Sequence, residues 1–129
     1  MHKKFLIIAA ILGAASVLLG AFGAHVLKAL LNEDTFQTFE TAVRYQFYHV
    51  FALLISAILF QQFPNKYLVW SCRFFLTGIV LFSGSLYALV FFLSQGNTSM
   101  KWLGIITPFG GISFIAGWIF MALAIAKNK

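Results

Sequence analysis

The sequence predicts an all-α fold, an integral membrane four-helix bundle, and three observations lead to this prediction. Hydrophobic residues make up 61% of the 129 residues and charged residues only 9%, whereas ordinary soluble domains carry about 25% charged residues. Four long stretches contain no charged side chain, and each meets the roughly 20 apolar residues that a helix needs to cross the hydrocarbon core. Almost no sequence is left for a second domain. We therefore expect a single membrane domain over residues 1–129, with spans at approximately residues 5–27, 45–64, 74–94 and 106–126.

The first span begins like a secretory signal peptide. Lys3 and Lys4 precede the apolar stretch, and Ala21 and Gly23 are small residues of the type found at cleavage sites. The apolar core of a signal peptide is about 7–15 residues long, however, whereas this stretch continues without a charge up to Lys28. A retained span is therefore favoured over a cleaved signal.

Small residues form a stripe along the first span. Steps of three and four residues place them on one side of a helix. In lipid, close packing of backbones replaces the hydrophobic effect as the force between helices. We expect the stripe to pack against a neighbouring helix of the same chain, and the alternatives are a homodimer seam and a substrate groove. The packing residues are Gly13, Ser16, Gly20 and Gly23.

An amphipathic helical extension is predicted before the second span and continuous with it. Asn32 or Asp34 is suited to cap its first turn, because either side chain can accept a hydrogen bond from a free backbone N–H group. Glu40 and Arg44 follow at positions i and i+4, which is the favourable order for an ion pair on a helix. We expect the extension to lie near the outer interface. Its apolar face consists of Phe36, Phe39, Val43, Phe47 and Val50.

The third and fourth spans contain serine, glycine and proline at positions that bear on packing. A Ser-Gly-Ser cluster at residues 83–85 offers hydroxyl groups to its own helix or to another one. Pro108 lacks a backbone donor, so the fourth helix either kinks at this point or begins there with Thr107 as its N-cap. Gly110 and Gly117 provide a second small surface for close helix packing.

The distribution of basic residues predicts the orientation in the membrane. With four spans, both termini and the second connection lie on one side, and the first and third connections lie on the other. One side then holds six basic residues and the other holds three. Because cytoplasmic segments carry the excess of Lys and Arg, both termini are predicted to be cytoplasmic. The inner residues are Lys3, Lys4, Lys66, Arg73, Lys127 and Lys129, and the outer residues are Lys28, Arg44 and Lys101.

Four segments of the chain resemble one known protein family. They are GAFGAH at residues 20–25, ETAVRYQFYH at 40–49, LFSGSLY at 81–87 and ITPFGG at 106–111. In this order they resemble the small bacterial inner-membrane family catalogued as domain of unknown function 423, which has eukaryotic transmembrane relatives. The resemblance covers nearly the whole chain and implies four membrane helices with a retained first span. It brings no activity, ligand or catalytic residue.

Seven polar residues lie toward the outer side on the predicted topology. Polar side chains at membrane depth are costly and usually face the interior of the bundle, which makes this group the candidate site. It comprises His25, Glu40, Arg44, Tyr45, His49, Tyr87 and Thr107.

A purely structural role is the alternative for each member of this group. Glu40 and Arg44 can neutralise each other, and His25 can hold two helices together by bonding a carbonyl or Glu40. His49 comes nine residues after Glu40, about 180° round the helix, and therefore shares a face with Tyr45 instead. This geometry argues against a Glu–His metal pair on one helix. No span contains an acid that could complete a catalytic set, so we expect no catalytic residue, metal or cofactor.

The leading interpretation is a non-enzymatic structural or interaction subunit of the bacterial inner (plasma) membrane. Its expected partners are the lipid bilayer and either further copies of itself, as a homo-oligomer, or other membrane subunits. The alternative is a small oligomeric transporter or channel that uses the outer-leaflet His, Glu, Arg and Tyr residues, and a proton-coupled form would have to use His25 or His49. The net charge of +6 does not indicate a nucleic-acid partner, because the nine Lys and Arg residues are scattered singly between apolar stretches.

Overall fold

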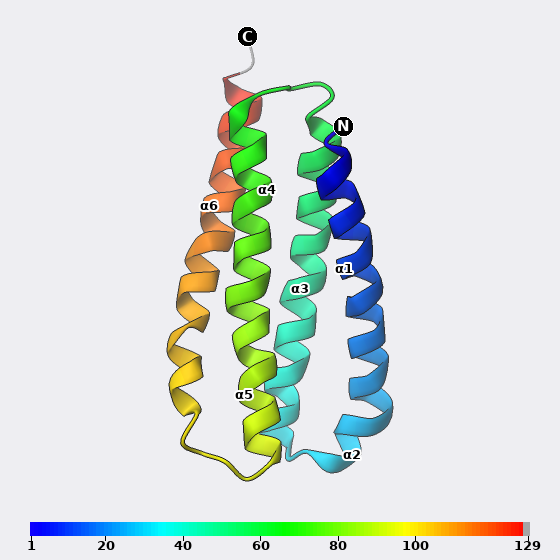
Figure 1. Ribbon diagram of the computed structural model, residues 1–129, viewed down its shortest axis with the longest axis vertical. Coiled ribbons are helices and arrows are strands. Elements are labelled where there is room, and N and C mark those ends of the chain that lie inside the picture. Colours follow the sequence, from blue (N-terminus) through cyan, green and yellow to red (C-terminus); the bar gives the residue numbers. More distant parts are fainter. Residues whose placement is uncertain (128–129) are drawn as a thin grey trace.

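Residues 1–127 of the computed structural model form four long helical segments that run up and down the molecule (Figure 1). Each segment is long and apolar enough to cross a membrane, so the expected all-α fold with four helices able to span a membrane is confirmed. The first and third segments each contain a turn of π-helix, and the fourth segment begins with a 3₁₀ turn. In chain order the elements are α1 (Lys3–Phe22), the π-turn η1 (Gly23–Leu27), α2 (Lys28–Leu30), α3 (Glu33–Leu59), α4 (Lys66–Gly78), the π-turn η2 (Ile79–Ser83), α5 (Gly84–Ser94), the 3₁₀ turn η3 (Lys101–Ile105) and α6 (Thr107–Ala126).

The helices are arranged as a row rather than a closed square. Figure 1 shows α1, α3, α4 and α6 side by side, with the start of α1 and the end of α6 at the same end of the molecule. Among the long helices, α1 makes extended contact only with α3, whereas α3 also packs on α4, η2 and α5. α6 packs mainly on α4 and η2. The most buried large side chains, Val50, Leu53, Leu68 and Phe75, therefore lie in the middle of the row.

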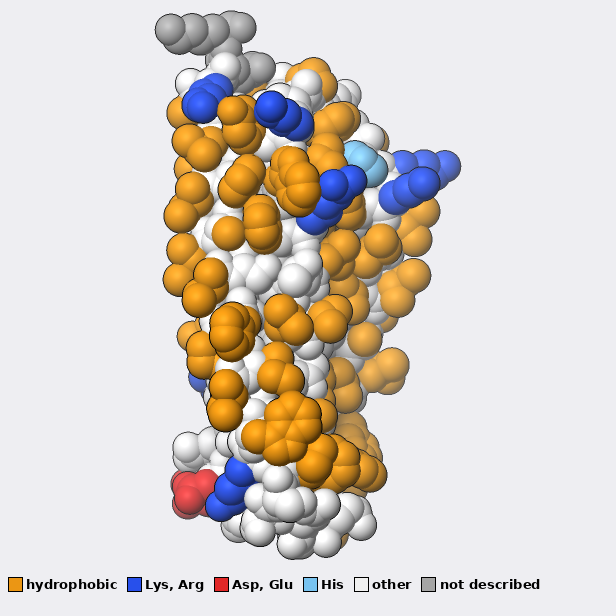
Figure 2. Space-filling view, turned by 60° about the vertical axis from the view of Figure 1, so that its left-hand side comes forward, with side chains coloured by type: hydrophobic (Ala, Val, Ile, Leu, Met, Phe, Trp, Pro, Cys, Tyr) orange, Lys and Arg blue, Asp and Glu red, His pale blue; other side chains and the backbone are white. Residues whose placement is uncertain are grey.

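Large apolar side chains cover the outer surface of the row. Leu18 is 72% exposed, Val80 68% and Ile112 63%. Figure 2 shows hydrophobic side chains over the middle of one face, most of the Lys and Arg toward the end that holds the termini, and Asp or Glu beside a further Lys or Arg at the opposite end. Lipid tails solvate apolar side chains, so such a surface is stable in a bilayer, with the charged groups at the two membrane–water interfaces.

The second helix begins as predicted but ends earlier than predicted. The amphipathic extension is the first part of one continuous helix, α3, and Asn32 caps it by accepting a hydrogen bond from the backbone N–H of Thr35 at 2.9 Å. α3 ends at Leu59 instead of residue 64. Residues 60–62 form turns, and Pro64 prevents the helix from continuing through Phe63, because the residue before a proline is pushed out of the helical conformation.

α4 begins at Lys66, well before the expected start at residue 74. The side-chain oxygen of Asn65 caps it by accepting from the N–H groups of Tyr67 and Leu68 at 3.0 and 3.3 Å. The side-chain amide of Asn65 also donates to the carbonyl of Ala124 at 3.2 Å and thereby ties the turn to α6. This part of the helix contains Lys66 and Arg73, so it lies outside the charge-free stretch that predicted the span.

The structure answers the question raised by Pro108: the α-helix begins there. Thr107 is the first residue of α6, and Pro108 lies in its first turn, where no helical hydrogen bond to its nitrogen is needed. The N-cap is Ile106 rather than Thr107. The Thr107 hydroxyl lies 2.7 Å from the Ser85 hydroxyl, so it joins α6 to α5 instead of capping its own helix.

The glycines expected to pack helices together lie at helix contacts. A methyl group built on Gly13 would meet Val50 at 3.5 Å, and one on Gly20 would meet Val43 at 3.7 Å. At Gly23 it would lie only 2.6 Å from the Phe39 ring. Ser16 is fully buried on the same side of α1 and donates to the carbonyl of its own helix, at Leu12. The small stripe therefore faces α3.

The glycines of α6 also lie at very close contacts. A methyl group on Gly117 would lie 2.6 Å from the Phe75 ring of α4, and one on Gly110 would lie 2.7 Å from the Phe82 Cα atom. The second contact is with backbone, which cannot rotate away. Backbones of α6 and η2 thus approach each other as closely as glycine allows.

Candidate functional site

The structure separates the seven predicted site residues into different surroundings. Glu40 and Arg44 line a cavity between α3 and the end of the first helical segment. Tyr45 and His49 lie on another side of α3, which faces α6. Tyr87 and Thr107 hydrogen-bond inside the helix row, and His25 is exposed. The group does not form one polar cluster.

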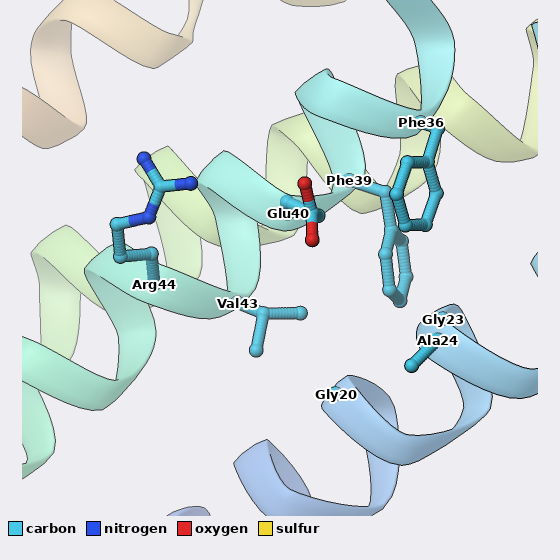
Figure 3. Close-up of a pocket in the computed structure, with 8 residues that line it drawn as sticks. All are labelled: Gly20, Gly23, Ala24, Phe36, Phe39, Glu40, Val43 and Arg44. Atoms are coloured by element: carbon cyan, nitrogen blue, oxygen red, sulfur yellow. The ribbon is translucent and has the colours of Figure 1, made fainter. Parts of the chain in front are cut away.

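The cavity at Glu40 and Arg44 has a volume of about 150 Å³. Figure 3 shows the two charged side chains one helical turn apart on α3, with the glycines of the first segment on the opposite side. The expected Glu40–Arg44 ion pair is not formed among the described residues, and the figure shows the carboxylate and the guanidinium apart. The lining residues are Gly20, Gly23, Ala24, Phe36, Phe39, Glu40, Val43 and Arg44.

A second cavity of about 330 Å³ adjoins the first and shares Phe36 and Glu40 with it. Lys28 and Glu33 are among its lining residues. The two cavities together form a groove lined by two basic residues, Arg44 and Lys28, and two acidic residues, Glu40 and Glu33. Glu40 lies where the two cavities meet.

The π-turn η1 shapes the first cavity. It directs Gly23 at the Phe39 ring and places Ala24 in the cavity wall. The next residue, His25, is exposed and is not part of the wall. The hydrogen bond expected between His25 and Glu40 is not among those that residues 1–127 form. A π-turn inserts one extra residue into the helix, which changes the direction of the side chains that follow.

Both ring nitrogens of His49 have hydrogen-bond partners. Its Nδ1 lies 2.7 Å from the Tyr45 carbonyl oxygen, which can only accept, and its Nε2 lies 3.3 Å from the indole nitrogen of Trp118, which can only donate. The ring is therefore the neutral tautomer with its proton on Nδ1. It also stacks on Phe114 at a centroid distance of 3.5 Å, and His49 is only 6% exposed. This is a histidine that packs α3 against α6.

Tyr87 belongs to a hydrogen-bond chain that crosses three helices. Its hydroxyl donates to the side-chain oxygen of Gln46 at 2.7 Å, and the side-chain nitrogen of Gln46 donates to the Leu12 carbonyl at 3.2 Å. The chain thereby joins α5, α3 and α1. Gln46 is 3% exposed and was not among the predicted site residues. A glutamine inside an otherwise apolar stretch is the sequence signal for such a link.

Buried serines link the remaining helices through hydroxyl-to-carbonyl hydrogen bonds. Ser83 donates to the Ala42 carbonyl at 2.7 Å, and Ser113 donates to the Phe74 carbonyl at 2.7 Å. Ser71 donates to the Gly117 carbonyl at 2.8 Å, and a second serine hydroxyl lies 3.1 Å from it. Every buried side-chain nitrogen and oxygen atom in the described part of the chain has a hydrogen-bond partner.

Within residues 1–127, no three His, Cys, Asp or Glu side chains gather closely enough to hold a metal ion. The chemistry that the groove offers is therefore that of its own side chains, a carboxylate and a guanidinium beside an apolar wall. Such a set can bind opposite charges. It contains no nucleophile next to a base.

The fold and these surroundings define a class of protein: a multi-pass α-helical membrane protein whose interior polar groups link its helices. The sequence profile of the family described as "Protein of unknown function (DUF423)" matches residues 19–111. The chain belongs to this family, and the expected family relationship is confirmed.

Curated relatives extend the similarity to the full length of the chain. The UPF0382 inner membrane protein YgdD of Escherichia coli strain K12 is 39% identical over 130 residues, which cover 100% of this chain and 95% of YgdD. A UPF0382 membrane protein of Haemophilus influenzae is 39% identical over 129 residues, or 100% of this chain and 98% of that protein. The UPF0382 membrane protein YwdK of Bacillus subtilis is 39% identical over 126 residues, which cover 97% of this chain and 98% of YwdK. No solved structure matches this chain significantly.

Proposed function

We propose that this protein is a non-enzymatic structural or interaction subunit of the bacterial inner membrane, with both termini in the cytoplasm. The observation that carries the proposal is that interior polar groups are engaged in contacts between helices. Ser83 donates to a backbone carbonyl, and both ring nitrogens of His49 are hydrogen-bonded. Groups held in this way stabilise the helix row, and their protons are engaged in helix contacts rather than directed at a substrate.

The exposed flank of α1 is the surface that we assign to contact with another subunit. α1 has extended contact with only one long helix, and Ala10, Ala14 and Ala21 lie exposed along one flank. Small side chains at this spacing let a further helix approach closely, which is the main source of helix association in lipid. The neighbour is either a second copy of this chain or another membrane subunit.

Light scattering and cross-linking of the protein purified in mild detergent test this assignment. We expect a homo-oligomer or a complex with a fixed ratio of subunits, and Ala14→Trp should dissociate it. Ile8→Trp is the matched control, because Ile8 lies six residues earlier, about 120° round the same helix, and is also exposed. A monomer with no partner at a fixed ratio, or equal behaviour of the two variants, contradicts the proposal.

A small oligomeric transporter is the second candidate, and the cavity at Glu40 and Arg44 is the observation that favours it. Both charged residues are exposed and would be accessible to a solute at the end of the bundle that holds the acidic residues. Solute uptake by proteoliposomes, abolished by Arg44→Gln, is the expected result for this function. If no solute uptake depends on Arg44, the transporter function is excluded.

A further inference from the structure

We infer that the Glu40–Arg44 cavity binds the headgroup of a zwitterionic aminophospholipid of the phosphatidylethanolamine class. In this arrangement the Arg44 guanidinium binds the lipid phosphate, and the Glu40 carboxylate binds the lipid ammonium group. The inference is independent of the subunit role, because it concerns the groove between α3 and the first segment and not the exposed flank of α1.

The first support is the spacing of the two charges. Glu40 and Arg44 are four residues apart, about 6 Å along the helix axis, and both side chains line the same cavity. The phosphate and the ammonium of an ethanolamine headgroup are joined by a short ethylene linker, so their separation is comparable with one turn. A guanidinium can donate two parallel hydrogen bonds to phosphate, and a carboxylate accepts hydrogen bonds from an ammonium.

The second support is the shape of the cavity. Gly20, Gly23 and Ala24 form the wall on the first helical segment, where long side chains would fill the space. The volume of about 150 Å³ is several times the roughly 30 Å³ of one water molecule in the liquid. It accommodates a headgroup and leaves the acyl chains outside, against the surface of the protein.

The third support is the surface that continues from the charged pair along α3. Phe47 and Phe51 follow Arg44 at steps of three and four residues, so they lie on the same face of the helix. Their ring centroids are 5.4 Å apart, and Phe51 is 53% exposed. Two neighbouring aromatic rings beyond the charged pair give an acyl chain an apolar surface to lie on. A soluble zwitterion has no acyl chain to pack on this apolar surface, so we assign the site to a lipid.

The carboxylate also sets the expected preference among lipids. An anionic headgroup such as phosphoglycerol has a phosphate for Arg44 but no cation for Glu40, and the carboxylate would repel it. A choline headgroup is a cation but has no N–H group to donate to the carboxylate. Phosphatidylethanolamine satisfies both side chains, so it should bind more tightly than either of the other two lipids.

Native mass spectrometry of the detergent-solubilised full chain is the test. Phosphatidylethanolamine, phosphatidylglycerol and phosphatidylcholine with identical acyl chains are added in turn, and the dissociation constants are compared. We expect phosphatidylethanolamine to bind about tenfold more tightly than phosphatidylglycerol, as one charge-assisted hydrogen bond would give. Glu40→Gln should remove this preference, and Arg44→Gln should weaken the binding of all three lipids.

Two further variants separate the site from general effects of charge and folding. Asp34→Asn with Lys101→Gln removes an acid and a base that line another cavity at the same end of the molecule, and this double variant should keep the preference. Ala24→Leu keeps both charges but fills the cavity, and it should abolish the preference while the helix content stays unchanged. Equal affinities for the three lipids in the parent protein, or an unchanged preference in Glu40→Gln, would overturn the inference. Competition by free phosphoethanolamine at lipid-like concentrations would also overturn it, because the occupant would then be a soluble zwitterion.

Discussion

Replacement of Gly110 by alanine tests the close approach of α6 to η2. The added methyl group would lie 2.7 Å from the Cα atom and 2.7 Å from the Cβ atom of Phe82. Overpacking typically costs about 1–3 kcal/mol, and the upper end applies here because backbone cannot change rotamer to relieve the contact. The better helix propensity of alanine offsets about 1 kcal/mol of this cost. We therefore expect Gly110→Ala to lower the unfolding free energy by about 2 kcal/mol.

Gly111 is the matched control for this prediction. It is the next residue of α6, and a methyl group built on it would have no neighbouring atom within 4 Å. Gly111→Ala should therefore keep or raise stability, by up to about 1 kcal/mol. The assay is reversible unfolding in mixed micelles with increasing denaturing detergent, followed by circular dichroism. If Gly110→Ala were as stable as Gly111→Ala, the two backbones could not be in contact as described.

Three further predictions concern orientation and packing. A reporter that is active only outside the cytoplasm, fused to Lys129, should give no signal, and activity there would reverse the topology inferred from the basic residues. Gly20→Leu should destabilise the protein by about 1–3 kcal/mol in the same unfolding assay because it overpacks the contact with α3, whereas Leu18→Ala on the lipid side should have a smaller effect. Tyr87→Phe should cost about 1 kcal/mol because a buried amide oxygen loses its donor. Tyr48→Phe, at an exposed position, is its control, and equal losses for the two tyrosines would contradict the hydrogen-bond chain.

The parts of the fold that depend on local sequence could be predicted. Stretches without charge indicated the four spans, because a charged side chain in the hydrocarbon core is costly. Asn32 was one of two candidate caps, and it is the N-cap of α3. The small stripe that contains Gly20 lies against α3, since a helix brings residues three and four apart to one side. These features follow from periodicity and capping, which act within one helix.

The parts that depend on contacts between helices could not be predicted in the same way. The early start of α4 does not follow from the charge-free stretches, because Arg73 lies outside them, whereas in the structure Arg73 is an exposed residue of the helix with its guanidinium 4.9 Å from the centroid of the Trp70 ring. The π-turn at η1 has no clear sequence signature, and without it His25 was expected to lie near Glu40. The partner of His49 is on α6, 69 residues further along the chain, and helical periodicity carries no information about that separation.

The arrangement in a row has a consequence for how the protein is assembled during synthesis. α1 packs mainly on α3 and α6 mainly on α4, so each half of the chain is a helical hairpin with its own extensive contact. Contacts between neighbours in sequence form rapidly, because little chain entropy is lost in closing the connection. The first hairpin can therefore be complete before the second leaves the ribosome. A chain cut in the turn between Leu59 and Lys66 should still assemble from its two halves, since the cut crosses neither hairpin.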